Sequence, residues 1–92
     1  MTPALRVRGG VAQEAKSWRW RCVVFLWHDR AGRGEPDERY QWPESYATEA
    51  EALAAYQAHV RPALVKMQQA VIESGGSLDV HRWGLEPREE PR

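Results

Sequence analysis

The sequence contains a single cysteine, Cys22, so no disulfide can form within the chain, and a reducing compartment suits it. No apolar run approaches the roughly twenty residues of a membrane-spanning helix, and the first ten residues lack the apolar centre of a secretion signal. We therefore expect a cytoplasmic protein that does not enter a membrane. Because 92 residues can bury one core but not two, we expect one small domain over residues 1–84 and a disordered tail over 85–92.

Net charge is also absent, because thirteen basic side chains balance thirteen acidic ones. Proteins devoted to nucleic acid usually carry a basic excess, so this balance argues against such a role without excluding a local basic patch. The charges are uneven: residues 1–34 hold seven basic and two acidic side chains, and residues 35–58 hold one and six. Most of the cations are arginines, which favours bidentate or stacked contacts.

The residue patterns of an enzyme are missing as well. The candidate metal ligands occur at none of the spacings typical of metal sites; they are His28, His59, His81, Cys22 and Asp29. The two glycines of residues 31–34 do not precede a helix start, so no phosphate-binding loop is predicted, and no nucleophile has an evident base. We therefore expect no catalytic residue, no metal and no cofactor.

The most distinctive feature present is Trp18–His28, a stretch of aromatic and β-branched residues that predicts the central strand of the fold. Alternate side chains of a strand point to opposite faces. The face expected to line the core carries Trp18, Trp20, Cys22, Val24 and Leu26. The second face mixes cations with rings and carries Arg19, Arg21, Val23, Phe25 and Trp27.

Shorter strands are expected at residues 4–8, 38–42 and 77–83. Two glycines follow the first of these, and we expect them to end it. Pro43 follows the second and either ends the pairing or marks a sheet edge. Residues 29–38, DRAGRGEPDE, are expected to form a charged hairpin loop, for which a functional role and a mobile connector both remain open.

Residues 48–74 predict one long helix, because Thr48 and Glu51 fit a capping box at its start and Gly75 follows its end. Its apolar stripe consists of Leu53, Tyr56, Val60, Leu64, Met67 and Val71. We expect the stripe to pack on the sheet, with a coiled coil as the alternative. Pro62 predicts a kink near residues 58–61, with two separate helices as the alternative.

The predicted fold is therefore α+β. It is an antiparallel sheet of three or four strands with one long, Pro-kinked helix packed on one face. The element order is β-β-α-β, to which residues 4–8 would add an N-terminal strand. The other sheet face is left to water or to a partner.

We predict a non-enzymatic interaction module that binds a protein partner, or itself, through the aromatic and arginine surface of the sheet and the charged loop. Trp, Tyr and Arg are enriched at interface hot spots. The candidate binding residues are Arg19, Arg21, Phe25, Trp27, Arg39, Tyr40 and Trp42. Such a module fits an adaptor, or an inhibitor carried by a phage or mobile element. The alternative is a small nucleic-acid-binding domain that uses the same face. A third reading is that the chain's own termini cover these rings.

A family resemblance supports the alternative. KSWRWRCVVFLW, a second strand and then YATEAEALAAY, together roughly residues 16–56, resemble the Arm-type DNA-binding domain at the N-terminus of tyrosine recombinases. The resemblance implies binding to DNA. The chain departs from this family in an acidic second strand and helix start, EPDERYQWPES, in a longer helix and in a further strand.

Overall fold

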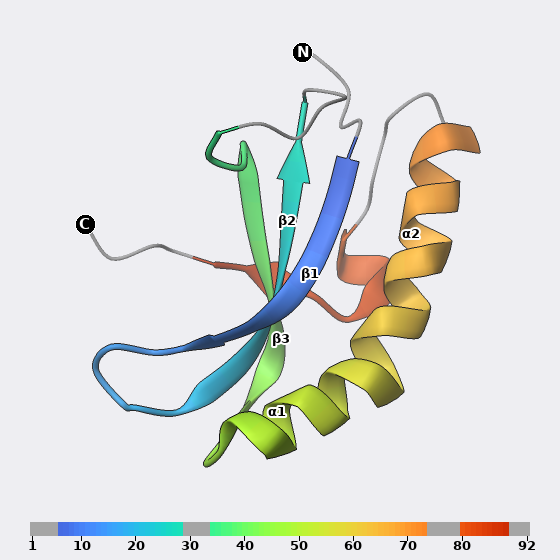
Figure 1. The fold of residues 1–92 in the computed structure, drawn as a ribbon. Coiled ribbons are helices and arrows are strands. Elements are labelled where there is room, and N and C mark those ends of the chain that lie inside the picture. Colours follow the sequence, from blue (N-terminus) through green and yellow to red (C-terminus); the bar gives the residue numbers. More distant parts are fainter. Residues whose placement is uncertain (1–5, 29–33, 74–79, 89–92) are drawn as a thin grey trace.

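The computed structural model describes residues 6–28, 34–73 and 80–88 and has an α+β fold (Figure 1). A four-stranded antiparallel sheet in the order β1-β2-β3-β4 carries one helical layer on one face, as predicted. The strands are β1 (Arg6–Gln13), β2 (Trp20–Trp27), β3 (Glu38–Tyr46) and β4 (Glu86–Pro87). The helical segments are α1 (Glu49–Ala55), the π-helical turn η1 (Tyr56–Val60), α2 (Arg61–Glu73) and the 3₁₀ helix η2 (Val80–Trp83). Within these ranges no helix has the length and apolarity to span a membrane.

Strand β1 is longer than predicted and pairs with β2 from Arg6–Trp27 to Gln13–Trp20. Gly9 and Gly10 lie inside this strand and do not end it, which corrects the expected boundary at residue 8. The physical reason is packing, because Gly9 faces the helix and the side chain of Tyr56 occupies the space of a β carbon. A glycine in a strand often marks such a close approach.

Strand β2 begins at Trp20, so the prediction that Trp18 lines the core is wrong. Trp18 lies in the β1–β2 turn with a left-handed backbone (φ 59°), and its side chain is 72% exposed. Its N–H donates to the carbonyl of Glu14, and its own carbonyl accepts from Nε2 of Gln13. These bonds reverse the chain, and the alternation therefore starts two residues later than the sequence suggests.

The core lies between the sheet and the helical layer. Its buried members come from β1, β2, the helical layer and the segment before β4, and are Val7, Cys22, Val24, Leu26, Val60, Met67 and Leu85. The predicted helix start is confirmed, since Oγ1 of Thr48 accepts the N–H of Glu51 at 3.2 Å. From Cys22 onward the side chains of β2 alternate as predicted, and those that line the core are Cys22, Val24 and Leu26.

The helical layer is continuous through Pro62 but contains the π-helical turn η1 just before it. The N–H of Arg61 bonds to the carbonyl of Tyr56, five residues back. Pro62 has no N–H to donate, which favours such a local rearrangement. Figure 1 shows that α1 and α2 run in different directions on either side of η1.

The π-helical turn also shifts the helical phase, so the prediction that Leu53 packs on the sheet is wrong. A π turn adds one residue to the helical repeat and rotates the residues before it relative to those after it. Leu53 is therefore 41% exposed, and Ala52 lies buried against Cys22 of the sheet in its place. The side chain of Val71 lies outside the described residues.

The C-terminal prediction needs two corrections. Residues 80–83 of the expected strand 77–83 form a 3₁₀ helix, and residues 77–79 lie outside the described ranges. The last strand is instead β4, which pairs with Tyr40 and Gln41 of β3. Leu85 is buried, so the predicted tail of 85–92 begins inside the fold, and its residues 89–92 lie outside the described residues.

Candidate functional site

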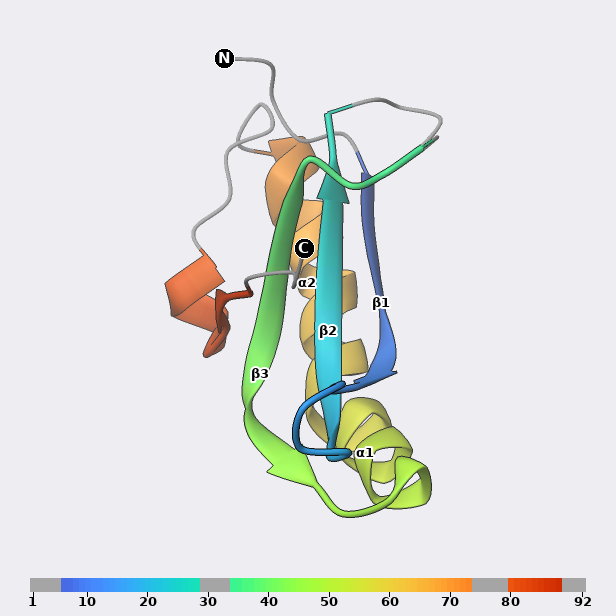
Figure 2. The same ribbon diagram turned by 90° about the vertical axis from the view of Figure 1, so that its left-hand side faces the viewer.

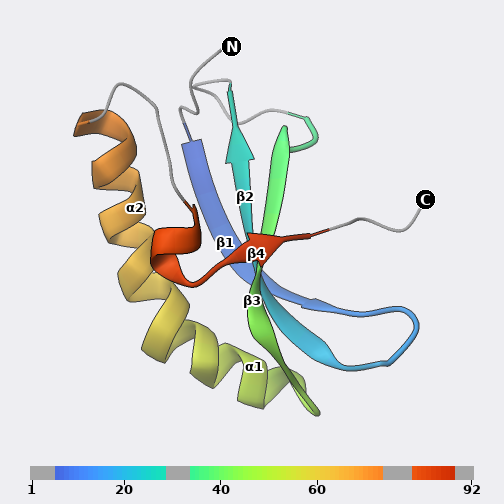
Figure 3. The ribbon, with the colours of Figure 1, turned by 180° about the vertical axis from the view of Figure 1, so that it is seen from behind.

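One face of the sheet has no described element over it. The layer of α1, η1 and α2 covers the other face, and Figure 2 shows β1, β2 and β3 in front of it. Figure 3 shows the same layers from behind, with β4 lying across β3. Residues directly opposite one another in an antiparallel pair share a face, so the strand register identifies the residues on this open face.

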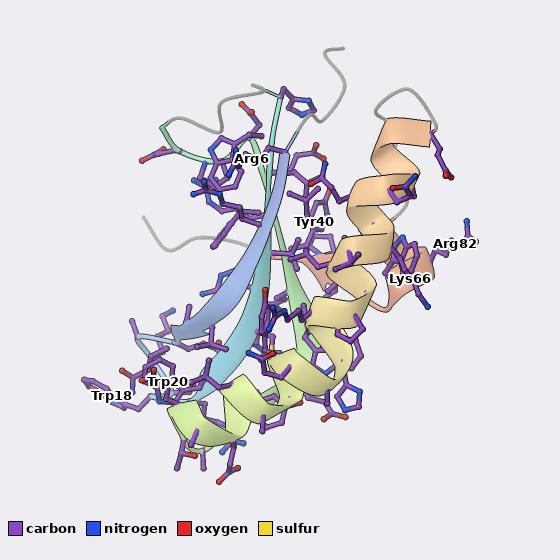
Figure 4. The ribbon with its side chains drawn as sticks, turned by 45° about the vertical axis from the view of Figure 1, so that its right-hand side comes forward. Arg6, Trp18, Trp20, Tyr40, Lys66 and Arg82 are labelled. Atoms are coloured by element: carbon purple, nitrogen blue, oxygen red, sulfur yellow. The ribbon has the colours of Figure 1, made fainter. Side chains whose placement is uncertain are left out.

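The register brings arginines from the two neighbouring strands around Phe25. Arg8 of β1 lies opposite Phe25, and Phe25 lies opposite Arg39 of β3. Arg6 lies opposite Trp27, one alternation further along β2. We name the following set the arginine face: Arg6, Arg8, Arg39 and Arg88 with Val23, Phe25 and Trp27. Figure 4 shows Arg6 on the side of the sheet away from the helices.

Two of the three apolar side chains of the arginine face are buried, and the third, Phe25, is half-buried. Val23 is 2% and Trp27 7% exposed. The guanidinium carbon of Arg8 lies 5.9 Å from the centre of the Trp27 ring, and Trp27 packs edge-on to Phe25 at 6.3 Å. The indole N–H of Trp27 donates to the carbonyl of Gly34 at 3.1 Å. The outer surface therefore carries the guanidinium groups, together with Gln41, which lies opposite Val23 in the register, and Glu86, which lies opposite Gln41.

The arginines of this face differ in their partners. Arg39 lies 3.8 Å from the carboxylate of Glu35, which is 94% exposed, and Arg88 donates to Oε1 of Gln41. Arg6 and Arg8 form no ion pair with any described residue, and Nε of Arg6 is buried without an acceptor among those residues. Two adjacent cations without acidic partners are suited to binding an anionic group.

Arg21 has a structural role that the sequence did not reveal. Between the pairs Arg21–Ser45 and Val23–Gln41, strand β3 contains two more residues than β2. Nη1 of Arg21 donates to the carbonyls of Trp42 and Pro43 in this bulge at 3.2 and 2.6 Å, and its Nε contacts Glu14 at 3.1 Å. Arg21 thus provides hydrogen bonds that a regular ladder would have supplied.

Arg19 lies in the turn before β2 and not on the strand. It donates from Nε to Oγ of Ser45 at 2.7 Å and from Nη2 to the Ser45 carbonyl at 3.0 Å. Both arginines that the sequence placed at the start of the binding surface are therefore held by the chain itself.

Two other candidates, Tyr40 and Trp42, are not on the arginine face. Tyr40 lies opposite Val24, and Figure 4 shows it between the sheet and α2. Burial raises the pKa of Tyr40 to about 12, and a 2.7 Å hydrogen bond to Glu38 adds to the rise. Trp42 packs against the core and stacks on His59 of η1 at 5.7 Å. Strand alternation separates both residues from Arg39.

Three arginines of this face, Arg6, Arg8 and Arg88, were missed by the sequence analysis. The alternation of residues 6–8 was visible, but only the register between β1 and β2 shows which face these side chains share with Phe25. Arg88 lies on the arginine face because β4, which precedes it, pairs with β3. Residues 29–33 of the predicted charged loop lie outside the described ranges.

Other chemistry is sparse in the described part of the chain. No group of three or more His, Cys, Asp or Glu side chains in it is placed to hold a metal ion. Comparison with known proteins found no match to a protein-family model, to a curated protein or to a solved structure. The resemblance to Arm-type domains therefore gains no support from these comparisons.

Proposed function

We propose that this chain is a non-enzymatic interaction module whose arginine face binds an acidic surface of a protein partner. The observation that carries the proposal is the pair Arg6 and Arg8, which lie on the uncovered sheet face without an acidic partner among the described residues. A planar guanidinium group matches a carboxylate with two parallel hydrogen bonds.

The burial of Trp27 beneath the arginines favours a protein partner over nucleic acid. Binders of single strands usually offer exposed rings on which bases stack. Here Trp27 is almost fully covered, and Arg8 lies over its ring. The chain as a whole carries no net charge, whereas nucleic-acid-binding domains usually carry a basic excess. Arginine and aromatic residues are both enriched at protein interfaces.

The proposal is tested with a soluble acidic polypeptide, poly-L-glutamate, added to ¹⁵N-labelled protein and followed by the Nε–Hε signals of arginine in NMR spectra. Signals of Arg6 and Arg8 are expected to shift in a saturable manner. The double variant Arg6→Gln/Arg8→Gln is expected to weaken binding about tenfold or more, as loss of an interface hot spot does.

The matched control is Lys66→Gln/Arg82→Gln, which removes the same charge from α2 and η2 on the other side of the molecule (Figure 4). This control should bind poly-L-glutamate as the wild type does. Equal weakening by both double variants would show nonspecific charge attraction and contradict the proposal. Tighter binding of an oligothymidylate, with a steep log-linear dependence on salt, would instead favour nucleic acid.

A further inference from the structure

Strand β1 is an edge strand with hydrogen-bonding groups that no described residue uses. The N–H of Val7 donates to Oε1 of Gln68 on α2 at 3.1 Å, so Val7 belongs to a pair that is not hydrogen-bonded to β2. By the alternation of an antiparallel ladder, the N–H and C=O groups of Gly9, Val11 and Gln13 also point away from β2. No hydrogen bond from the described chain reaches these groups.

We propose that a second copy of this chain pairs with this edge, antiparallel, with Val11 facing its own counterpart on a twofold axis. In this register Gly9 faces the partner's Gln13, and Gln13 faces the partner's Gly9. The three facing pairs supply about six backbone hydrogen bonds, two for each pair. The two sheets become one sheet of eight strands with a closed, isologous interface.

The side chains in this register are complementary. On the helix-covered side the half-buried Val11 meets its counterpart. On the open side the small residue Gly10 faces the partner's Ala12, so neither blocks close approach. Arg8, which has no acidic partner among the described residues, faces the partner's Glu14, and this carboxylate then lies between Arg8 and Arg21 of its own chain, which it contacts at 3.1 Å. Opposite charges directly across a strand pair are favourable.

Gln68 selects this register over its nearest alternative. A twofold axis at Gly9 would place Val7 opposite the partner's Val11 and would require the Val7 N–H that Gln68 already binds. With the axis at Val11, Val7 lies just beyond the paired segment and keeps its bond to Gln68. This inference does not rest on the proposed function, because the backbone groups at the edge of β1 carry it and Arg8 is the one residue of the arginine face that enters it.

Sedimentation velocity tests the dimer. The wild type is expected near 21 kDa, twice the chain mass of 10.6 kDa. The variant Val11→Pro should be a folded monomer, because proline at this position removes an outward N–H and no bond to β2. The control Gly10→Ala should remain dimeric, since a β carbon there has no neighbour within 4 Å. A monomeric wild type, or a folded Val11→Pro dimer, would overturn the proposal.

Disulfide trapping tests the register without weakening the fold. Gly10→Cys chains mixed with Ala12→Cys chains should form a mixed disulfide under mild oxidation, because these positions face each other across the axis. Each variant alone should cross-link much less. The buried Cys22 does not compete. Equal cross-linking in the mixture and in the separate samples would contradict the proposed register.

Discussion

The side chain of Tyr56 lies against the backbone of Gly9, where a β carbon would come within 2.8 Å of the tyrosine hydroxyl oxygen and 2.9 Å of Cε2. Any larger residue at position 9 must displace the ring of Tyr56 from its place against β1. We expect Gly9→Ala to lower the free energy of unfolding by about 1–3 kcal/mol, the usual cost of overpacking a well-packed contact. Urea denaturation measures this change.

The neighbouring glycine is the control for that experiment. A β carbon at Gly10 would meet nothing within 4 Å. Gly10→Ala should therefore leave the stability unchanged or raise it by about 0.5–1 kcal/mol, because alanine restricts the unfolded chain. If both variants lost the same stability, the contact with Tyr56 would not be the cause.

Arg21 should matter more for stability than its place near the surface suggests. Its guanidinium group bonds Glu14 and two carbonyls of the β3 bulge, and its side chain is 16% exposed. We expect Arg21→Lys to lower the free energy of unfolding by about 1–3 kcal/mol, because an ammonium group cannot hold these divergent acceptors together. Arg19→Lys, at an exposed position in the turn, should cost less than about 0.5 kcal/mol. Equal losses would show that the bulge contacts do not stabilise the fold.

Tyr40 should make the fold sensitive to alkaline pH. Its pKa is about 12 in the folded chain, and an unfolded tyrosine titrates near pH 10. The unfolded state therefore loses the proton first, so the stability that Tyr40 contributes is constant below about pH 10 and falls as the pH rises toward 12.

The pH dependence of the free energy of unfolding checks this point. Tyr40→Phe should give a shallower fall between about pH 10 and 12, because the titrating group is gone. Burial also raises the pKa of Tyr46 and Tyr56, so part of the fall should remain. An unchanged slope in the variant would mean that Tyr40 titrates normally in the folded protein.

Cys22 should react with thiol reagents only when the chain unfolds. The side chain is fully buried, and burial raises the pKa of the thiol, so the reactive thiolate is both scarce and inaccessible. Labelling in native buffer should be at least about 10³-fold slower than in urea, as expected for a fold stable by 5 kcal/mol or more. Rapid labelling without denaturant would show local opening between β2 and α1.

Local signals in the sequence were reliable where the physical cause lies within a few residues. The Thr48 cap depends on one hydrogen bond to Glu51 three residues later, and the structure forms it. The alternation of β2 from Cys22 to Trp27 follows from strand geometry alone. Local signals misled where a distant partner altered the rule, as at Gly9, which sits under Tyr56, and at Leu53, which the π-helical turn rotates out of the core.

By itself, the sequence determined the α+β class, the central strand, the start of the long helix and the burial of Cys22, Val24 and Leu26, because alternation, helical spacing and capping act between near neighbours. Only the tertiary structure decided which arginines share the open face, that Arg21 closes a bulge and that Leu85 belongs to the core. These features depend on the register between strands far apart in the chain. Register is set by the packing of the whole core, and no local sequence pattern predicts it.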